Sequence, residues 1–187
     1  FSGSGSPALI ADAIEDLKSL GVLRGDPAVA DRGAGISVTE FPLSTIVLNV
    51  NTGCNLSCTY CYKEDLTTPS KGEKLDFDKA KKSIELLLKE GAKRDRVNVV
   101  FFGGEPLSNM RLIKAVTAYA EERCREEGKQ VDFSLTTNAT LLTEEIADWF
   151  NEHSFGISIS MDGPQAVHDL RRKTIGGKGT YEVVAKK

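Results

Sequence analysis

The sequence has no excess of positive charge and no hydrophobic run long enough to cross a bilayer. Its 24 Lys and Arg residues are outnumbered by 27 Asp and Glu residues, which gives a formal net charge of -3. A nucleic-acid partner is therefore not indicated, because nucleic-acid-binding proteins concentrate positive charge. No apolar run approaches the roughly 20 residues of a membrane-spanning helix, and no basic-then-apolar leader opens the sequence. We expect a cytoplasmic protein with no nucleic-acid and no membrane partner.

Cysteine and histidine are also scarce. There are four cysteines, and three of them, Cys54, Cys58 and Cys61, fall within eight residues. A disulfide framework spreads its cysteines to connect distant segments, so this crowding argues against one. The spacing indicates an intracellular metal or cluster site. The other residues that could serve as ligands are Cys124, His153 and His168.

Residues 1–35 are expected to form a helix and a linker. Ser6 suits a helix N-cap and Pro7 the first helical position. Apolar residues then recur at helical spacing, at positions 9, 10, 13, 14, 17 and 20. The segment 24–35 is rich in Gly, Asp and Ala, which is typical of a connector. We treat 1–35 as an appendage to a domain formed by residues 36–187.

The domain alternates between strand and helix patterns. Short apolar runs with β-branched residues predict strands at 44–50, 96–102, 130–136 and 155–161. Apolar residues at helical spacing predict helices at 76–90, 111–127 and 143–152, with a further helix beginning near 180. This alternation implies βαβ units and a parallel sheet. Four units are too few for a closed eight-unit barrel of about 250 residues. The predicted fold is therefore α/β, a partial (β/α) barrel of parallel strands.

Unusual residues follow each predicted strand. Cys54 follows the first strand, the GGEP segment at 103–106 the second, Thr137 and Asn138 the third, and the DGP segment at 162–164 the fourth. Chemistry gathers at the carboxyl ends of parallel strands, so we expect these segments to meet at one edge of the sheet. GGEP is an unusual turn after a buried strand and favours function. DGP alone fits an ordinary turn equally well.

The cysteine loop reads GCNLSCTYCY at 53–62, with the spacing C-x3-C-x2-C. Thiolates are the usual ligands of iron–sulfur clusters, and a fully cysteine-ligated cubane takes four of them. Three ligands leave one iron open, which catalysis needs. Structural zinc wants four ligands in paired patterns, and the ferredoxin spacing differs. A cluster is favoured, with zinc and buried structural thiols as the alternatives.

The cysteine loop and the segment after the second strand resemble the radical S-adenosylmethionine (SAM) superfamily. The spacing of Cys54, Cys58 and Cys61 after a first strand is similar to the superfamily signature, and GGEP at 103–106 matches its second motif. Together these two motifs are highly specific. The resemblance covers residues 44–187.

Two later segments agree in order with the same superfamily. LTTN at 135–138 resembles its third-strand segment. SMDGP at 160–164, with His168, Asp169 and Arg172 behind it, resembles the SAM-contacting segment of sulfatase-maturing and peptide-modifying members. The resemblance implies a reduced cluster that gives one electron to SAM, producing methionine and a 5′-deoxyadenosyl radical that takes hydrogen from a substrate carbon. The protein then positions the substrate and excludes water.

The resemblance also implies the site residues. Cys54, Cys58 and Cys61 would bind a [4Fe–4S] cluster whose open iron is chelated by SAM. A backbone carbonyl of the GGEP turn, or the Glu105 carboxylate, would meet the SAM amino group. The residues of this turn are Gly103, Gly104, Glu105 and Pro106. The other implied SAM contacts are the Tyr60 backbone at adenine, Ser160 and Asp162 at the ribose, Arg172 at the carboxylate, and Thr136 and Asn138 nearby.

Within the superfamily, the sequence looks like peptide maturases of the SPASM type, which carry a C-terminal cysteine-rich extension. The segments NVNTGCNLSCTYCYKEDL and FFGGEPLSNM are similar to maturases of quinohemoprotein amine dehydrogenase, which form thioether cross-links. This likeness implies a peptide or small protein substrate, an electron donor of the flavodoxin or ferredoxin type, and a leader-peptide-binding module whose tail is 1–35.

The sequence departs from the family pattern in two respects. It shows four of the usual six strands, and it has no cysteine-rich extension, so we expect at most one cluster. Two other functions stay open. The first is sulfatase-type oxidation of Cys or Ser to formylglycine. The second is a non-catalytic peptide-binding module braced by zinc or a cluster.

The remaining conspicuous residues are given structural roles. Cys124 lies on an apolar helical stripe and is expected in the core. Trp149 and Phe150 are expected to face the core as well. His153 follows a helix end and is expected at the surface. His168 is expected to form structural hydrogen bonds.

Overall fold

A computed structural model describes residues 7–23, 42–62 and 71–187. The chain divides into two units, Phe1–Phe41 and Pro42–Lys187. In the first unit, helix α1 spans Pro7–Ser19, as predicted, and exposes Ile10, Ile14 and Leu17. The predicted cap Ser6 and the connector lie outside the described residues. No described helix is long and apolar enough to span a membrane.

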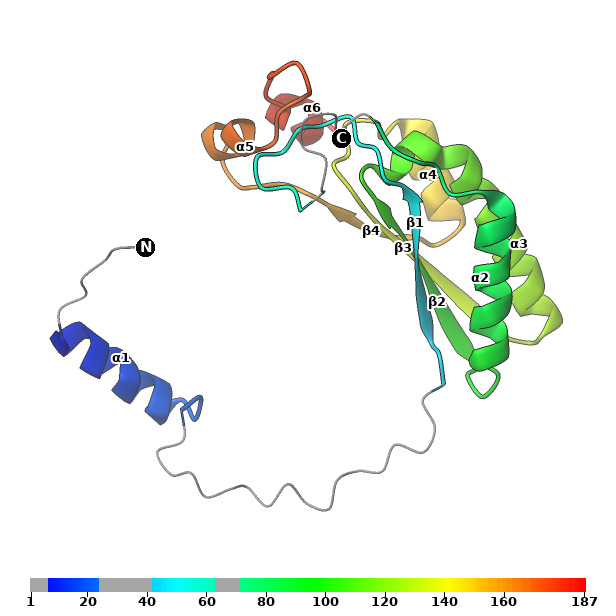
Figure 1. Cartoon of the computed structure of the whole chain (residues 1–187), viewed down its shortest axis with the longest axis horizontal. Coiled ribbons are helices and arrows are strands. Elements are labelled where there is room, and N and C mark those ends of the chain that lie inside the picture. Colours follow the sequence, from blue (N-terminus) through cyan, green and yellow to red (C-terminus); the bar gives the residue numbers. More distant parts are fainter. Residues whose placement is uncertain (1–6, 24–41, 63–70) are drawn as a thin grey trace. The chain divides into compact units, whose positions relative to one another are not determined.

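The second unit contains a four-stranded sheet with the order β1-β2-β3-β4, and every neighbouring pair is parallel. The strands are β1 (Thr45–Asn51), β2 (Arg96–Gly103), β3 (Gln130–Thr137) and β4 (Gly156–Ile159). Figure 1 shows the strands running side by side, with the connecting helices between them in sequence. The α/β fold with parallel strands is confirmed. Each helical crossover connects two strands that are neighbours in the sheet.

Three helices cover one side of this sheet (Figure 1). They are α2 (Phe77–Glu90), α3 (Met110–Glu126) and α4 (Glu144–Glu152). The predicted caps are confirmed, because the side chain of Asp76 accepts from two backbone N–H groups of α2 and that of Thr143 from one of α4. Each cap satisfies amide donors that the first helical turn leaves unpaired.

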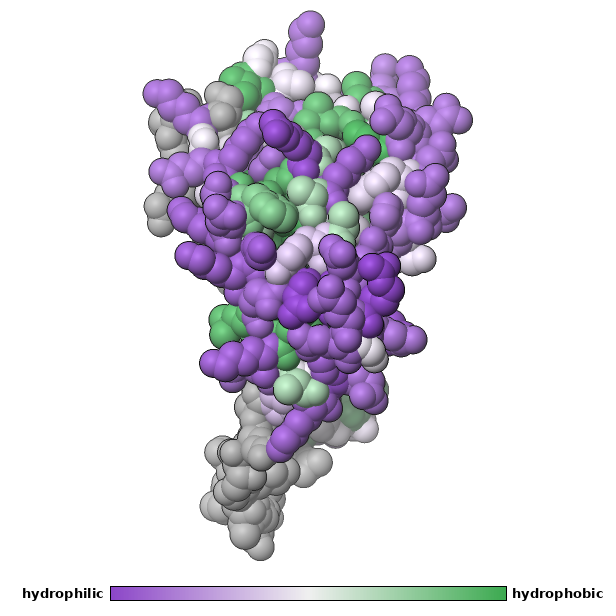
Figure 2. Space-filling view, turned by 90° about the vertical axis from the view of Figure 1, so that its right-hand side faces the viewer, coloured by the Kyte–Doolittle hydropathy of each residue, from purple (hydrophilic) through white to green (hydrophobic). Residues whose placement is uncertain are grey.

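The core lies between the sheet and these helices. Strand residues alternate, so Leu48, Val99 and Leu135 are buried while Val47 on the opposite face is 61% exposed. That alternation is the two-residue period of a strand. The predicted stripe of α3 is buried, including Cys124. The outer faces of the helices are largely hydrophilic (Figure 2), as expected for amphipathic helices.

Several aromatic residues pack against one another in the core. The rings of Phe133 and Phe155 stack with centroids 5.1 Å apart, and Phe150 lies 4.8 Å from Phe155. Phe150 is buried and Trp149 is partly buried against the core, as predicted. His153 is half-buried, and its Nδ1 lies 2.7 Å from a carboxylate oxygen of Glu121.

Three short elements complete the unit beyond the carboxyl ends of the strands. They are η1 (Pro106–Asn109), α5 (Gln165–Arg171) and α6 (Tyr181–Ala185). The sequence patterns predict no helix between the strand 155–161 and the helix near 180, and the structure corrects this with α5. Seven residues contain too few apolar positions to show a helical period, and α5 has no side-chain cap. The predicted strand 155–161 is also shorter, because its pairing with β3 ends at Ile159.

Candidate functional site

The cysteine loop leaves β1 and is attached on one side to the turn after β2. The backbone N–H of Gly104 donates to the carbonyl of Asn51 at 2.7 Å, and that of Glu105 donates to the carbonyl of Gly53 at 3.1 Å. The Asn51 side chain also accepts the Gly53 N–H at 2.9 Å. These bonds place the start of the cysteine loop directly beside the GGEP turn.

The other side of the loop is attached to the C-terminal end of α5 and to the segment that follows it. Leu56 and Thr174 form an antiparallel bridge. The backbone N–H of Ser57 donates to the carbonyl of Lys173 at 2.8 Å, and that of Thr59 donates to the carbonyl of Arg171 at 3.0 Å. Because the loop is held by backbone bonds on both sides, its thiols have a defined position at the carboxyl edge of the sheet.

A cavity of ≈ 170 Å³ opens between the loop and the strand ends. Its lining includes ten predicted site residues: Cys54, Cys58, Tyr60, Cys61, Gly103, Gly104, Thr136, Asn138, Ser160 and Arg172. Residues that follow four different strands therefore meet in one place, as their sequence positions predict. The lining also contains Thr137, which follows the third predicted strand, and Leu56, Tyr62 and Phe102, which the sequence patterns do not indicate as site residues.

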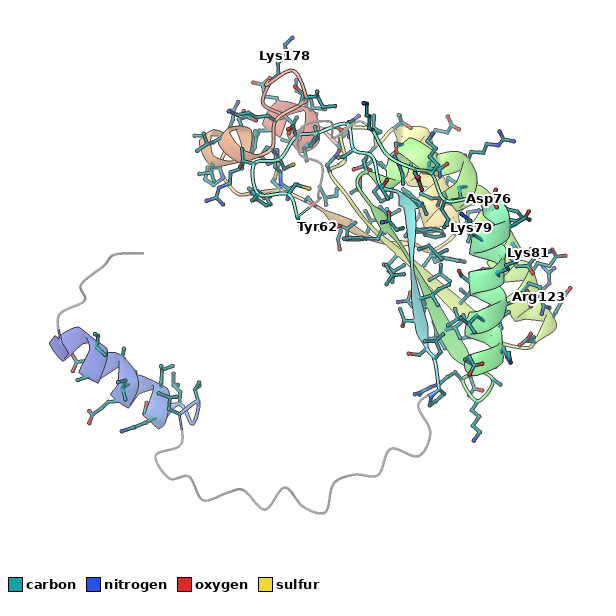
Figure 3. The ribbon with its side chains drawn as sticks, viewed as in Figure 1. Tyr62, Asp76, Lys79, Lys81, Arg123 and Lys178 are labelled. Carbon is teal, nitrogen blue, oxygen red and sulfur yellow. The ribbon has the colours of Figure 1, made fainter. Side chains whose placement is uncertain are left out.

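Tyr62 and Phe102 form an aromatic pair at this cavity. Their rings are stacked with centroids 6.4 Å apart. Tyr62 is 75% exposed, and Figure 3 places it on the side of the sheet away from α2. Tyr62 directly follows Cys61. Phe102 alternates with Phe101, which is buried in the core, so Phe102 points to the opposite face of the sheet, and this alternation is the signal that could have found it.

The three thiols of the loop are partly buried and close enough to interact. Burial raises the pKa of Cys58, the Arg172 guanidinium lowers it, and Cys54 and Cys61 raise it further. The Cys58 thiolate would therefore be stabilised by a positively charged group, which a metal or a cluster supplies. Thiolates crowded at a cavity wall are a donor set that fits an iron–sulfur cluster.

A structural zinc ion would need a fourth protein ligand beside these three thiols. Among residues 7–23, 42–62 and 71–187, no three Cys, His, Asp or Glu side chains are placed to hold one metal ion. Tetrahedral zinc with bonds of about 2.3 Å needs sulfur atoms about 3.8 Å apart, whereas in a cubane each cysteine binds a different iron. Cys124 is in the core, and both histidines are hydrogen-bonded elsewhere.

Glu105 does not line the cavity, in contrast to one predicted role. Its side chain is fully buried, and it accepts from the Leu107 N–H at 2.9 Å, the Thr137 hydroxyl at 2.7 Å and the Asn138 N–H at 2.9 Å. Burial raises its pKa, although these three bonds act in the opposite direction. The carboxylate is therefore a structural anchor, and contact with SAM through a backbone carbonyl of the turn stays a prediction. Pro106 is buried too.

Asp162 forms hydrogen bonds with two other site residues, and its contact with the ribose stays a prediction. Its carboxylate accepts from the Tyr60 hydroxyl at 2.9 and 2.7 Å and from the Arg172 Nε at 2.9 Å. Burial alone would raise the pKa of Asp162, but these hydrogen bonds outweigh it and the pKa is lowered. Burial and the bond to Asp162 raise the pKa of Tyr60 to about 12. Asp162 thus connects the cysteine loop to the cavity-lining arginine.

His168 forms structural hydrogen bonds, as predicted. It is fully buried, its Nε2 is 3.0 Å from the Thr180 hydroxyl oxygen, and its Nδ1 accepts from the Asp162 N–H at 3.4 Å. The Thr180 hydroxyl donates to the carbonyl of Arg172 at 2.7 Å. This chain of bonds sets the tautomer of His168 and fixes the backbone that carries Arg172.

Replacing Gly103 with alanine should destabilise the protein by about 2 to 3 kcal/mol. Gly103 has φ +144°, and an added Cβ would lie 2.3 Å from the Asn51 carbonyl oxygen. Gly128→Ala is the matched control, because Gly128 has φ +65° with open space around it and should cost about 1 kcal/mol. Urea unfolding measures both. Equal losses would show that the close approach to Asn51 is unimportant.

The geometry of the site agrees with the comparisons with known proteins. The model of the radical SAM superfamily matches residues 48–186. The chain belongs to the radical SAM superfamily. Superfamily members use a [4Fe–4S] cluster and SAM, and the three thiols at the cavity are the predicted ligands of this cluster.

Several relatives are anaerobic sulfatase-maturating enzymes. The cysteine-type enzyme of Clostridium perfringens is 31% identical over 147 residues, which cover 76% of this chain and 39% of the relative. The serine-type enzyme of Klebsiella aerogenes is 30% identical over 142 residues, covering 75% and 34%. The solved structure "Native anSMEcpe with bound AdoMet" has a TM-score of 0.68 and 30% identity, covering 78% of this chain and 40% of that one.

These comparisons revise the narrower resemblance drawn from the sequence. The chain spans well under half the length of these relatives, 39% and 34% for the two enzymes. The likeness to quinohemoprotein amine dehydrogenase maturases finds no support, and formylglycine formation, the alternative, is better supported. Both classes of maturase share the radical SAM motifs, so these short motifs do not distinguish one class from the other.

Proposed function

We propose that this chain is the cluster- and SAM-binding part of a radical SAM enzyme that oxidises a cysteine or serine of a peptide to formylglycine. The observation that carries the proposal is the cavity lined by Cys54, Cys58 and Cys61 together with the ends of the strands. The relatives that mature sulfatases support the choice of reaction. Another structure of anSMEcpe, 28% identical to this chain, is described with bound AdoMet and a peptide.

In this proposal, Cys54, Cys58 and Cys61 hold the cluster, which supplies the electron that breaks a carbon–sulfur bond of SAM. The backbone of the GGEP turn accepts from the SAM amino group. Arg172 lines the cavity with a guanidinium that suits a carboxylate, and Asp162 holds it in place through Nε.

The remaining cavity-lining residues hold SAM and exclude water in this proposal. Ser160 offers a hydroxyl to the ribose, and the backbone at Tyr60 meets the adenine. The Tyr62–Phe102 pair forms an apolar wall. Thr136 and Asn138 complete the lining.

The proposed reaction balances without a further oxidant. A serine side chain loses two hydrogen atoms from Cβ and Oγ to become an aldehyde. A cysteine side chain loses the same two equivalents and exchanges its sulfur for the oxygen of water, releasing hydrogen sulfide. SAM accepts two electrons and one proton overall, as one hydrogen on the deoxyadenosyl carbon, and leaves as methionine and 5′-deoxyadenosine. The second proton is released to the solvent. The one electron that starts SAM cleavage would return to the cluster when the substrate radical is oxidised. The overall reaction therefore uses up no external electron.

The partners follow from this chemistry. The substrate is a peptide or small protein that presents Cys or Ser. The first electron comes from a donor of the flavodoxin or ferredoxin type. Residues 1–35 are proposed as the tail of a leader-peptide-binding module, and 36–187 as the N-terminal part of the barrel with at most one cluster.

Incubation with peptides distinguishes the functions that the sequence left open. The reconstituted protein, with dithionite and SAM, should release 5′-deoxyadenosine and convert a Cys- or Ser-containing peptide to a product that reacts with a hydrazide. Formylglycine has an aldehyde that a thioether cross-link lacks, so hydrazide labelling and mass spectrometry separate them.

The matched control is a peptide with alanine in place of the Cys or Ser, which should give no aldehyde. A cross-linked product that resists the hydrazide would replace formylglycine formation with thioether formation. A colourless protein with stoichiometric zinc and no 5′-deoxyadenosine would replace the enzyme with a zinc-braced binding module.

A further inference from the structure

Asn138 lies at the end of β3 with its side chain between two loops. Its Nδ2 is 3.7 Å from the Sγ of Cys54 and 3.0 Å from the Oδ1 of Asn55. Its Oδ1 accepts from the N–H of Thr140 at 3.0 Å and from its hydroxyl at 2.6 Å. A side-chain amide has two N–H donors and one carbonyl acceptor. The four contacts therefore use its hydrogen-bonding capacity and fix the amino end toward the sulfur.

The backbone around Asn138 is anchored independently of its side chain. The Asn138 N–H donates to the buried Glu105 carboxylate at 2.9 Å, and the Thr137 hydroxyl donates to the other oxygen at 2.7 Å. The Ala139 N–H donates to the Thr137 Oγ1 at 2.9 Å. Asn138 itself is 7% exposed. A substitution of its side chain should therefore leave the loop in place and remove only the contacts of the amide.

We propose that Asn138 is a positioning residue that donates an N–H···S hydrogen bond to the Cys54 thiolate and so raises the reduction potential of the cluster that Cys54 holds. The inference rests on the proposed function, because the cluster is its cofactor. The Leu56 N–H, 3.4 Å from the same sulfur, is a second donor. Two donors thus converge on one ligand of the cavity.

The direction of the effect follows from charge. The reduced cluster carries one more negative charge than the oxidised one, so its sulfur ligands accept stronger hydrogen bonds. A donor therefore stabilises the reduced state more than the oxidised state, and hydrogen bonds to sulfur are a recognised control of cluster potential. Low exposure of Asn138 to water strengthens the effect, because the local dielectric is low.

An EPR-monitored redox titration of the reconstituted chain tests this. Asn138→Leu and Asn138→Asp both remove the N–H donors, one without and one with an added charge. Both should titrate at a more negative potential than the parent. We expect about a tenfold smaller reduced-to-oxidised ratio at a fixed potential, which is about 59 mV for one electron.

Thr140→Val is the matched control. It removes the hydroxyl that the Asn138 Oδ1 and the Asn55 Nδ2 both contact, but it keeps the Thr140 N–H and the donor to Cys54. At a fixed potential, the reduced-to-oxidised ratio of Thr140→Val should stay within about threefold of the ratio of the parent. A Thr140→Val shift as large as that of Asn138→Leu would assign the effect to general loosening of the loop and overturn the inference.

A second measurement does not depend on the Asn138 variants assembling a cluster. The parent chain, labelled with ¹⁵N in asparagine and reduced, should show a ¹⁵N hyperfine coupling that persists in Asn55→Ser. Absence of this coupling, or equal potentials for the parent and both Asn138 variants, overturns the inference while leaving SAM cleavage intact. A parent chain without a cluster or SAM cleavage overturns the proposed function as well.

Discussion

Alanine at Cys54, Cys58 or Cys61 should abolish cluster assembly, whereas alanine at Cys124 should leave it intact. The three thiols line one cavity, and a cubane held by three cysteines has no protein ligand to replace a lost one. Cys124 is 2% exposed in the core, on a stripe of α3. Together, the two outcomes distinguish the loss of a cluster ligand from a general effect of removing any cysteine.

Iron and sulfide analysis after anaerobic reconstitution provides the measurement. Each loop variant should fall to background, and Cys124→Ala should match the parent apart from a loss of about 1 kcal/mol in the free energy of unfolding. The SAM-dependent change in the EPR signal of the reduced parent should also disappear with the cluster. Full cluster occupancy in any loop variant, or a loss in Cys124→Ala, would contradict the ligand assignment.

Removing the Glu105 side chain should destabilise the fold by about 3 to 5 kcal/mol. Glu105→Ala leaves three donors, from Leu107, Thr137 and Asn138, without their acceptor in a site that water does not reach. Glu85→Ala is the matched control, because Glu85 contacts Arg123 at a 41% exposed surface position and should cost about 1 kcal/mol or less.

Urea unfolding of the cluster-free protein, followed by the fluorescence of its one tryptophan, compares these variants. Stability should also depend on pH through Glu105. Burial raises its pKa in the folded state, so the folded state holds the proton at a higher pH than the unfolded state. The free energy of unfolding should therefore fall as pH rises from the unfolded pKa through the folded one. Glu105→Gln should remove this slope, and a slope that persists would assign it to another group.

The elements were predictable because their local signals agree with the packing. Asp76 and Thr143 stand directly before the helices that they cap, so each cap is a local sequence signal. Alternating apolar runs mark the strands in the same local way. The meeting of ten predicted residues in one cavity follows from the parallel sheet, which brings the strand ends to one edge.

The orientation of individual side chains was not predictable in the same way. Glu105 and Asp162 stand within functional motifs, yet one carboxylate turns into the interior and the other pairs with Tyr60 and Arg172. Those choices depend on contacts between segments distant in sequence. Helix α5 was missed because a seven-residue helix is stabilised by the elements around it, including the bonds of His168.

The bridge between Leu56 and Thr174 has a consequence for biosynthesis. A chain grows from its N-terminus, so the three thiols leave the ribosome long before the segment that holds their loop in place. Such long-range pairing also forms slowly. During this interval the loop lacks its backbone contacts with residues 171–174, and its thiols are open to oxidation. Delivery of iron and sulfide to the nascent protein is therefore best timed after the chain has passed Thr174.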